Sequence, residues 1–326
     1  MILRVVSYGG FPGLPEYVVP GERDFSRISV CRCTEHARHH DVFTIAPGIT
    51  ALLPCETNLP DTQMIYHPRT GQFIGLAIKD TTAVVQSESG TILLECPLPA
   101  LRWPESYSCA QRLALLSDNP LRFGAMLFAC QPIGRFGVLH SHRCTIAELH
   151  DNNCTVLSDI VRTNQDPAPF HFLCAHEGHL YASALSAQSP YRFDGPESLI
   201  ELSAGLDPSL KPCPMHSFGP LMLDGKMRLA LVLELAPDEV TRHFLLYILD
   251  ESGKWTSHCK LASLTKEQEV LIALTSHDLL HTVPMQSDRP NLWRALNVSF
   301  YVNGGLFAAL FDAETASTLC FWQIVL

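Results

Sequence analysis

The stretch LMLDGKMRLALVLELAPDEVTRHFLLYILDESGKWTSHCKL, residues 221–261, decides the fold. It holds four apolar segments separated by turn signals at Asp224-Gly225, at 236–243 and at Glu251-Ser252-Gly253. Glycine adopts the positive φ of a tight hairpin, so the pattern predicts four consecutive antiparallel strands. Residues 229–233 are apolar at every position, as expected for a strand enclosed between two neighbouring sheets. Such a four-stranded meander is one blade of a β-propeller.

Parts of this unit recur along the chain. A strand–glycine–strand pattern occupies 171–184 and 298–312, and strand–polar turn–strand patterns occupy 64–78 and 145–158. We expect 64–78 to be the outer half of its blade. With a propeller unit of about 40–50 residues, the length predicts an all-β propeller of six or seven four-stranded blades. An irregular β-sandwich is the alternative.

The chain shows no low-complexity linker, so we predict one domain over 1–326, with 1–45 as an irregular N-terminal segment. Only 106–116 and 264–274 carry helix signals. The end of the chain, 318–326 (TLCFWQIVL), reads as an apolar strand. Because an unpaired apolar edge aggregates, we expect this strand to pair with one from the N-terminal part.

Composition excludes several classes of protein. The 326 residues are 47% hydrophobic and carry a formal net charge of −10, which argues against disorder and against general nucleic-acid binding. Apolar runs such as 229–235 are shorter than the roughly 18 residues that a membrane helix needs. The N-terminus lacks a signal-peptide pattern, so we expect a cytoplasmic or nuclear protein whose cysteines are free thiols.

No catalytic motif is present: the chain lacks the Gly-x-Ser-x-Gly elbow and the glycine-rich phosphate loops. A His/Cys cluster at 31–41 offers zinc-ligand types, but its Cys-x-Cys spacing differs from the C-x2-4-C and H-x3-5-H groups of structural zinc sites, which favours a solvated loop. We therefore assign no catalytic residue, metal or cofactor. The alternative is a metal-dependent enzyme on an all-β propeller scaffold that uses histidines such as His140, His142, His176 or His179.

Several segments resemble the kelch-type propeller of plant F-box proteins. The Tyr66–Gly71 turn (YHPRTG), the 84–94 strand (VVQSESGTILL), the 176–181 hairpin (HEGHLY) and the unit from 223 to 255 with its late Trp255 carry the resemblance. It covers roughly 60–326, while 1–40 show no F-box. The resemblance implies the substrate-recognition part of a ubiquitin-ligase receptor, with ubiquitin-ligase components among its partners.

Two loops on the rim are the predicted protein-binding surface, because loops on a rigid scaffold carry most binding sites. They are 186–198 and 236–243. Aromatic and arginine side chains commonly anchor protein interfaces. The candidate binding residues are Tyr191, Arg192, Phe193, Asp238, Glu239 and Arg242. The sequence thus favours a protein-binding propeller without nucleic-acid or membrane partners.

Overall fold

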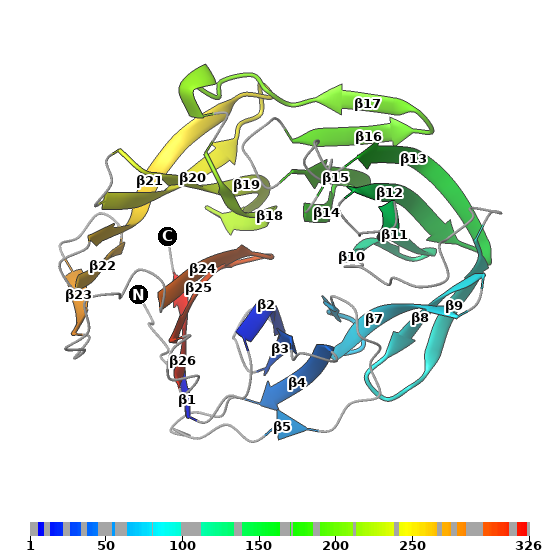
Figure 1. Ribbon diagram of the computed structural model, residues 1–326, viewed down its shortest axis with the longest axis horizontal. Helices are drawn as coiled ribbons and strands as arrows, with labels where there is room; N and C mark the ends of the chain where they lie inside the picture. The colour runs from blue at the N-terminus through cyan, green and yellow to red at the C-terminus, as the bar shows by residue number, and fades with distance from the viewer. Residues whose placement is uncertain are drawn as a thin grey trace.

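A computed structural model shows the chain as antiparallel sheets arranged in a ring (Figure 1). The structure describes residues 6–9, 14–21, 27–33, 38–44, 54–55, 64–79, 81–98, 112–133, 139–163, 170, 172–184, 190–210, 213–237, 241–265, 269–274, 279–284, 296–312 and 318–324. These residues form six sheets and one 3-10 helix, η1 (Pro208–Leu210). Within those ranges, no helix has the length and apolar character needed to span a membrane.

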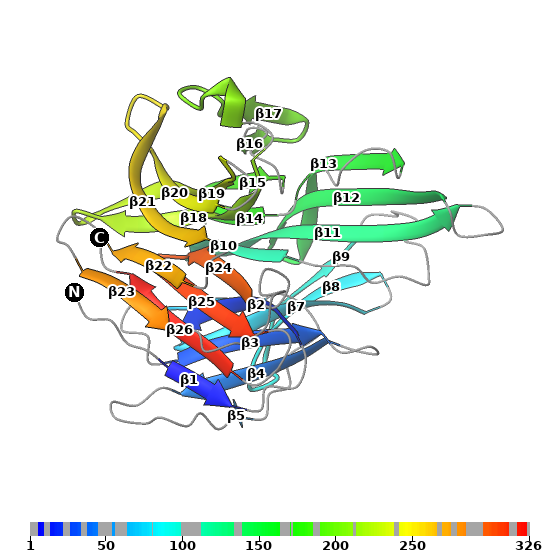
Figure 2. The ribbon, with the colours of Figure 1, turned by 60° about the vertical axis from the view of Figure 1, so that its left-hand side comes forward.

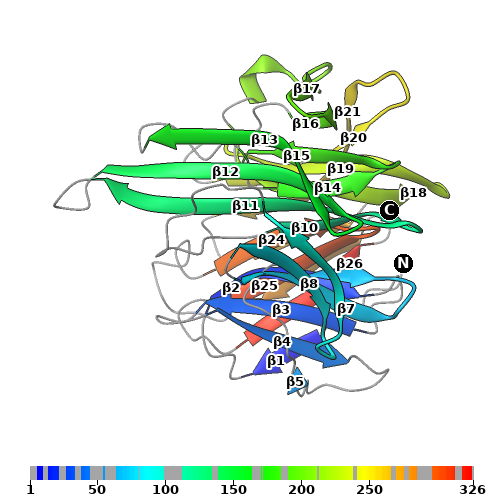
Figure 3. The ribbon, with the colours of Figure 1, turned by 90° about the vertical axis from the view of Figure 1, so that its right-hand side faces the viewer.

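We call the six sheets blades 1 to 6. The strands of blades 1 to 3 follow the chain order, from the inside of the ring outward. They are β2 (Leu14–Gly21), β3 (Arg27–Cys33), β4 (Arg38–Thr44) and β5 (Pro54–Cys55); β6 (Ile65–His67), β7 (Gln72–Lys79), β8 (Thr82–Ser87) and β9 (Ile92–Pro97); and β10 (Arg112–Asp118), β11 (Leu121–Ile133), β12 (Leu139–His150) and β13 (Asn153–Thr163). Figure 3 shows β11, β12 and β13 reaching past the other blades.

Blades 4 and 5 are built in the same way, whereas blade 6 combines both ends of the chain. Their strands are β14 (Phe172–His176), β15 (His179–Ser183), β16 (Tyr191–Gly195) and β17 (Ser198–Glu201); β18 (Met215–Leu223), β19 (Lys226–Leu235), β20 (Thr241–Leu249) and β21 (Trp255–Thr265), extended outward by β22 (Glu269–Leu274) and β23 (Leu279–Pro284); and β24 (Leu296–Val302), β25 (Leu306–Asp312), β26 (Thr318–Ile324) and β1 (Val6–Gly9). The meander predicted for 221–261 is therefore confirmed.

The innermost strands of successive blades contact one another around the ring. β2 contacts β6, β6 contacts β10, β10 contacts β14, β14 contacts β18, β18 contacts β24, and β25 of blade 6 contacts β2. This radial arrangement is a β-propeller, and the sandwich alternative is wrong. The total of six or seven blades stays a prediction.

The last blade joins the two ends of the chain. β1 pairs antiparallel with β26, from Val6 opposite Phe321 to Gly9 opposite Thr318, and Figure 2 shows the two strands side by side. The expectation that the C-terminal strand pairs with an N-terminal one is confirmed. The expectation of an irregular segment over 1–45 is wrong, because β1, β2, β3 and β4 lie within it.

Apolar side chains fill the spaces between blades. Residues 229–233 of β19 are each at most 1% exposed, as predicted for a strand enclosed on both faces. Leu229, Leu231 and Leu233 pack against Cys174 of blade 4 and against Trp255, which is 2% exposed. Trp255 thus anchors the packing between blades 4 and 5. Burial of this kind is the main stabilising contribution to the ring.

Tight turns at the inner hairpins depend on positive φ. Gly178 and Gly225 have φ of 77° and 75°, and the preceding Glu177 and Asp224 have φ of 48° and 49°. Positive φ at both central residues is the two-residue turn whose twist matches the flanking strands. The glycine signal in the sequence therefore marks these hairpins correctly.

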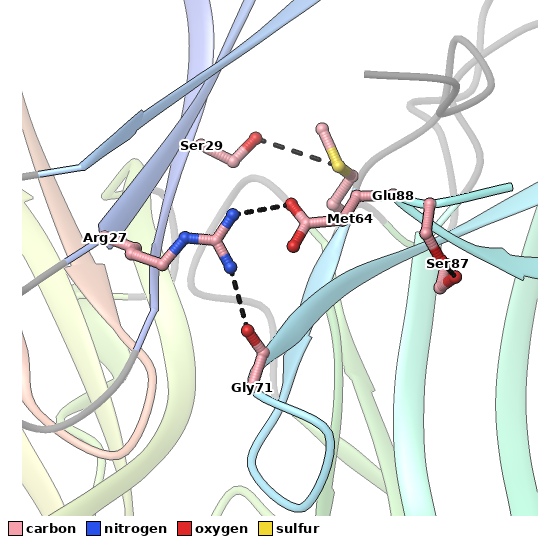
Figure 4. A network of polar contacts seen from close by, with 7 residues as sticks. Arg27, Ser29, Met64, Gly71, Ser87 and Glu88 are labelled. Atoms are coloured by element: carbon pink, nitrogen blue, oxygen red, sulfur yellow. Dashed lines mark hydrogen bonds and ion pairs between the residues drawn. The ribbon is translucent and has the colours of Figure 1, made fainter. Parts of the chain in front are cut away.

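Polar contacts also join neighbouring blades. Arg27 of blade 1 donates from Nη1 to the Gly71 carbonyl (2.8 Å) and from Nη2 to Glu88 Oε2 (2.8 Å), both in blade 2 (Figure 4). Its guanidinium also lies 5.3 Å from the centroid of the Phe73 ring. A charge held by two acceptors and an aromatic face fixes blade 1 against blade 2.

Three local expectations are corrected. Residues 112–116 lie in β10 and 269–274 in β22, so helices are absent from those described parts of 106–116 and 264–274. Pairing with neighbouring strands overrides the local helix propensity there. The 64–78 hairpin is the inner half of blade 2, because β6 and β7 are its first two strands.

Candidate functional site

Three of the predicted binding residues lie in a strand. Tyr191, Arg192 and Phe193 belong to β16, which corrects the loop predicted for 186–198. Phe170 packs edge-on against the rings of Tyr191 and Phe193, each with centroids 5.8 Å away, and Phe193 is 3% exposed. Phe193 is therefore core and cannot contact a partner. The sequence predicts a loop here because this short strand is flanked by Pro190 and by Gly195-Pro196, which are typical of turns.

Arg192 lies on the surface but is held by its own blade. Its Nε donates to Asp194 Oδ1 (2.7 Å) and its Nη2 to Asp194 Oδ2 (2.9 Å). This two-pronged contact lowers the pKa of the Asp194 carboxyl below its ordinary value. The side chain of Arg192 thus organises the hairpin of blade 4.

Arg242, by contrast, lies in a group of polar side chains, which we call the Glu234 cluster: His216, Glu234 and Arg242. His216 Nε2 donates to Glu234 Oε2 (2.6 Å), and Arg242 Nη1 lies 3.2 Å from Glu234 Oε1. The His216 ring also meets the Phe244 ring edge-on, with centroids 4.9 Å apart. One carboxylate therefore holds a histidine and an arginine on its two oxygens.

Three strands of blade 5 bring the cluster together. His216 lies near the start of β18, Glu234 near the end of β19 and Arg242 near the start of β20, so the antiparallel meander places all three at one end of the sheet. We call this end of the blades, where second and third strands are joined, the loop face. Tyr191, near the start of β16, lies at the same end of blade 4. Asp238 and Glu239, in the β19–β20 connection, lie outside the described residues.

A β-bulge aims His216 at Glu234. The pairing of β18 with β19 shifts register between Met215 and Ser217, which leaves His216 as the extra residue. Bulges of this kind redirect side chains and are common next to functional sites. Sequence reasoning missed both His216 and Glu234. The only signal was one charged residue, Glu234, within the apolar run 229–235.

The electrostatics of the cluster favour a charged Glu234. The hydrogen bond from His216 lowers the pKa of the Glu234 carboxyl, and Arg242 adds to this effect, while burial opposes it. The Glu234 side chain is 12% exposed, whereas that of Arg242 is 44% exposed. The buried carboxylate thus holds an exposed arginine at the loop face.

We expect Glu234→Gln to lower the free energy of unfolding at pH 7 by about 1–3 kcal/mol, because His216 and Arg242 lose a charged partner. A carboxyl with a lowered folded pKa stabilises the fold above its ordinary value of 4.5, and this contribution is lost as the pH falls through the folded pKa. The difference from wild type should therefore shrink at pH 3.5. Urea unfolding at both pH values measures it. The control is Glu251→Gln, at an exposed carboxylate whose Oε1 lies 3.0 Å from Lys226 Nζ. For this variant we expect no measurable change in the free energy of unfolding.

A second polar group lies at the opposite end of the blades, where first and second strands are joined. The buried His67 ring has Nδ1 3.0 Å from Thr70 Oγ1, and Nε2 2.9 Å from Asp118 Oδ1. Because β6 carries His67 and β10 carries Asp118, this contact ties blade 2 to blade 3.

The histidines of the enzyme alternative are dispersed. His176 and His179 face each other across the β14–β15 hairpin, while His140 and His142 lie in β12 of another blade. Cys31 and Cys33 of the His/Cys cluster lie in β3. Within the described part of the chain, no three side chains of metal-ligating type gather to hold an ion.

Comparison with known proteins finds similar structures but no relative by sequence. No protein-family model and no curated protein matches the chain. Similar solved structures include a protein of unknown function from Bacteroides thetaiotaomicron (TM-score 0.51, 8% identity, covering 98% of this chain and 75% of that one). Another is the Pan2 WD40 domain of Neurospora crassa (TM-score 0.46, 10% identity, covering 96% of this chain and 89% of that one). A third is the β-propeller domain of the Trilobed protease from Pyrococcus furiosus (TM-score 0.40, 11% identity, covering 96% of this chain and 83% of that one). With its radially packed meanders, this chain is a β-propeller.

Proposed function

We propose that the chain is a protein-binding β-propeller of the cytoplasm or nucleus, and that the loop face of blade 5 contacts the partner. The observation that carries the proposal is the Glu234 cluster. It holds Arg242 on a rigid sheet, with 44% of the side chain exposed. A preorganised arginine loses little conformational freedom on binding, and arginine is enriched among residues that dominate interface energies.

The chemistry of the cluster favours a protein partner with acidic or carbonyl groups. Glu234 and Arg242 carry opposite charges, so the exposed guanidinium offers directional donors rather than a broad positive field. The net charge of −10 disfavours a phosphate backbone at this surface.

Affinity capture from cell extract with matched variants tests this proposal. We expect recovery of a specific partner that falls about 30-fold with Arg242→Glu, the effect of an interface residue worth about 2 kcal/mol. The control is Lys254→Glu, an exposed charge in the β20–β21 turn at the other end of the same blade. Partners that bind both variants equally well would place the binding surface elsewhere.

A finer proposal is that the captured partner is a substrate of a ubiquitin ligase. It is supported by the resemblance of residues 66–71, 84–94 and 176–181 to the kelch-type propellers of F-box proteins. We expect ubiquitin-ligase subunits among the proteins recovered with the intact chain, and faster ubiquitination of the partner when the chain is added. Recovery of specific partners without any ligase subunit would support the binding function and contradict the ligase role.

A further inference from the structure

The outermost strand of blade 4 exposes side chains on both faces. All four residues of β17 are exposed, including Leu199 and Ile200 at 38% each. Successive side chains of a strand point to opposite faces, so each face of β17 carries side chains that remain partly exposed. Among the residues that the structure describes, β17 pairs only with β16.

The main chain of Leu199 points toward the open edge. Leu202 N–H donates to the Pro190 carbonyl (2.8 Å), which fixes the phase of the β16–β17 ladder. In an antiparallel pair, alternate residues direct their N–H and C=O groups to the partner strand. Ile200, opposite Arg192, therefore bonds to β16, while the groups of Leu199 face outward. This edge can accept another strand.

The neighbouring blade shows what covers such an edge. In blade 5, the fourth strand, β21, pairs on its outer side with β22, through Ser263 opposite Leu271 and Leu264 opposite Val270. β22 is an antiparallel strand with the apolar sequence EVLIAL. The same position in blade 4 bears exposed apolar side chains and no added strand among the described residues. Strand addition to a sheet edge is a common mode of peptide recognition.

The negative charge beside β17 restricts which strand can bind at this edge. The exposed carboxylates of Glu197 and Glu201 lie at the two ends of β17. A second copy of β17, paired antiparallel, would bring like charges together, which is destabilising. We propose that the outer edge of blade 4 binds an extended segment of a partner protein that carries apolar, β-branched residues between basic ends. This site lies on blade 4, apart from the Glu234 cluster of blade 5, and does not depend on that cluster.

Hydrogen exchange with a synthetic strand tests the proposal. The probe is the peptide Lys-Thr-Val-Thr-Val-Thr-Lys, added to the full chain. At saturation we expect exchange of the Leu199 amide to slow about tenfold, because the probe accepts its hydrogen bond. Leu199→Pro removes this outward N–H, and proline is tolerated on edge strands. The variant should weaken peptide binding at least tenfold in a fluorescence anisotropy titration.

Further variants keep the test decisive. Leu199→Lys repels the basic probe and should weaken binding similarly if the proline variant does not fold. Val161→Lys alters an exposed apolar residue of another blade, 62% exposed on β13, and should bind as wild type does. Arg242→Glu should also bind normally, which separates this site from the loop face. Absent binding, an unchanged Leu199 amide, binding that survives both Leu199 variants, or self-association through β17 would each overturn the proposal.

Discussion

Replacing Gly219 with alanine is expected to lower the free energy of unfolding by about 3 kcal/mol or more, because no space exists for the added methyl. A Cβ at this position would lie 2.3 Å from the Val302 carbonyl oxygen of the neighbouring blade. Real Cβ atoms do not approach another atom so closely, and the obstacle is backbone rather than the end of a flexible side chain. Either β18 or β24 would have to move.

Hydrogen bonds hold that backbone in place. Val302 N–H donates to Ser217 Oγ (2.8 Å), and Gly304 N–H donates to the Pro220 carbonyl (2.7 Å). Moving β24 away from Gly219 would break these buried contacts between blades 5 and 6. The clash therefore destabilises the contact between blades 5 and 6, because it cannot be relieved by moving a single side chain.

Urea unfolding at pH 7 measures this effect. The matched control is Gly178→Ala, where φ is +77° but a Cβ would have nothing within 4 Å. It should cost only about 1–2 kcal/mol, from the left-handed backbone conformation. A Gly219→Ala protein that is as stable as the Gly178→Ala protein would show that the inner strands do not approach as described.

Deleting residues 319–326 is expected to give insoluble protein. The deletion removes nearly all of β26, which pairs with β25 on one side and with β1 on the other. Both remaining strands would then expose an unpaired edge, and β25 (LFAALFD) is strongly apolar. Without β26, the two ends of the chain are also no longer joined in one sheet.

The soluble fraction after expression, followed by circular dichroism of any soluble material, measures the result. Deleting only 325–326, beyond the end of β26, is the control and should leave the protein soluble. A soluble, folded protein lacking 319–326 would mean that blade 6 does not need its third strand.

Much of the fold can be predicted from the sequence, because two of its determinants are local. Glycine at Gly178 and Gly225 marks the inner hairpins, and the unbroken apolar run at 229–233 marks a strand enclosed on both sides. The predicted helix at 264–274 fails for the opposite reason. Its local propensity favours a helix, but pairing with β21 and β23 decides the structure of 269–274.

The candidate site could be predicted only in part. Arg242 is a candidate from the sequence because it lies in the predicted loop 236–243 between apolar strands. Its partners His216 and Glu234 were missed, because a bulge in β18 and the pairing of three strands bring them together. Phe193 was misassigned because burial between blades depends on Phe170, which is distant in sequence.

A cross-link between the two ends of the chain tests the closure of the ring most directly. Ser7 of β1 lies opposite Cys320 of β26. Directly opposed residues of antiparallel strands have Cα atoms about 4.5–5.5 Å apart, within the range that a disulfide spans. In the Ser7→Cys variant, mild oxidation followed by mass spectrometry of peptides should find the introduced thiol joined to Cys320. An introduced thiol that stays reduced, or that joins a different cysteine, would contradict the closed propeller.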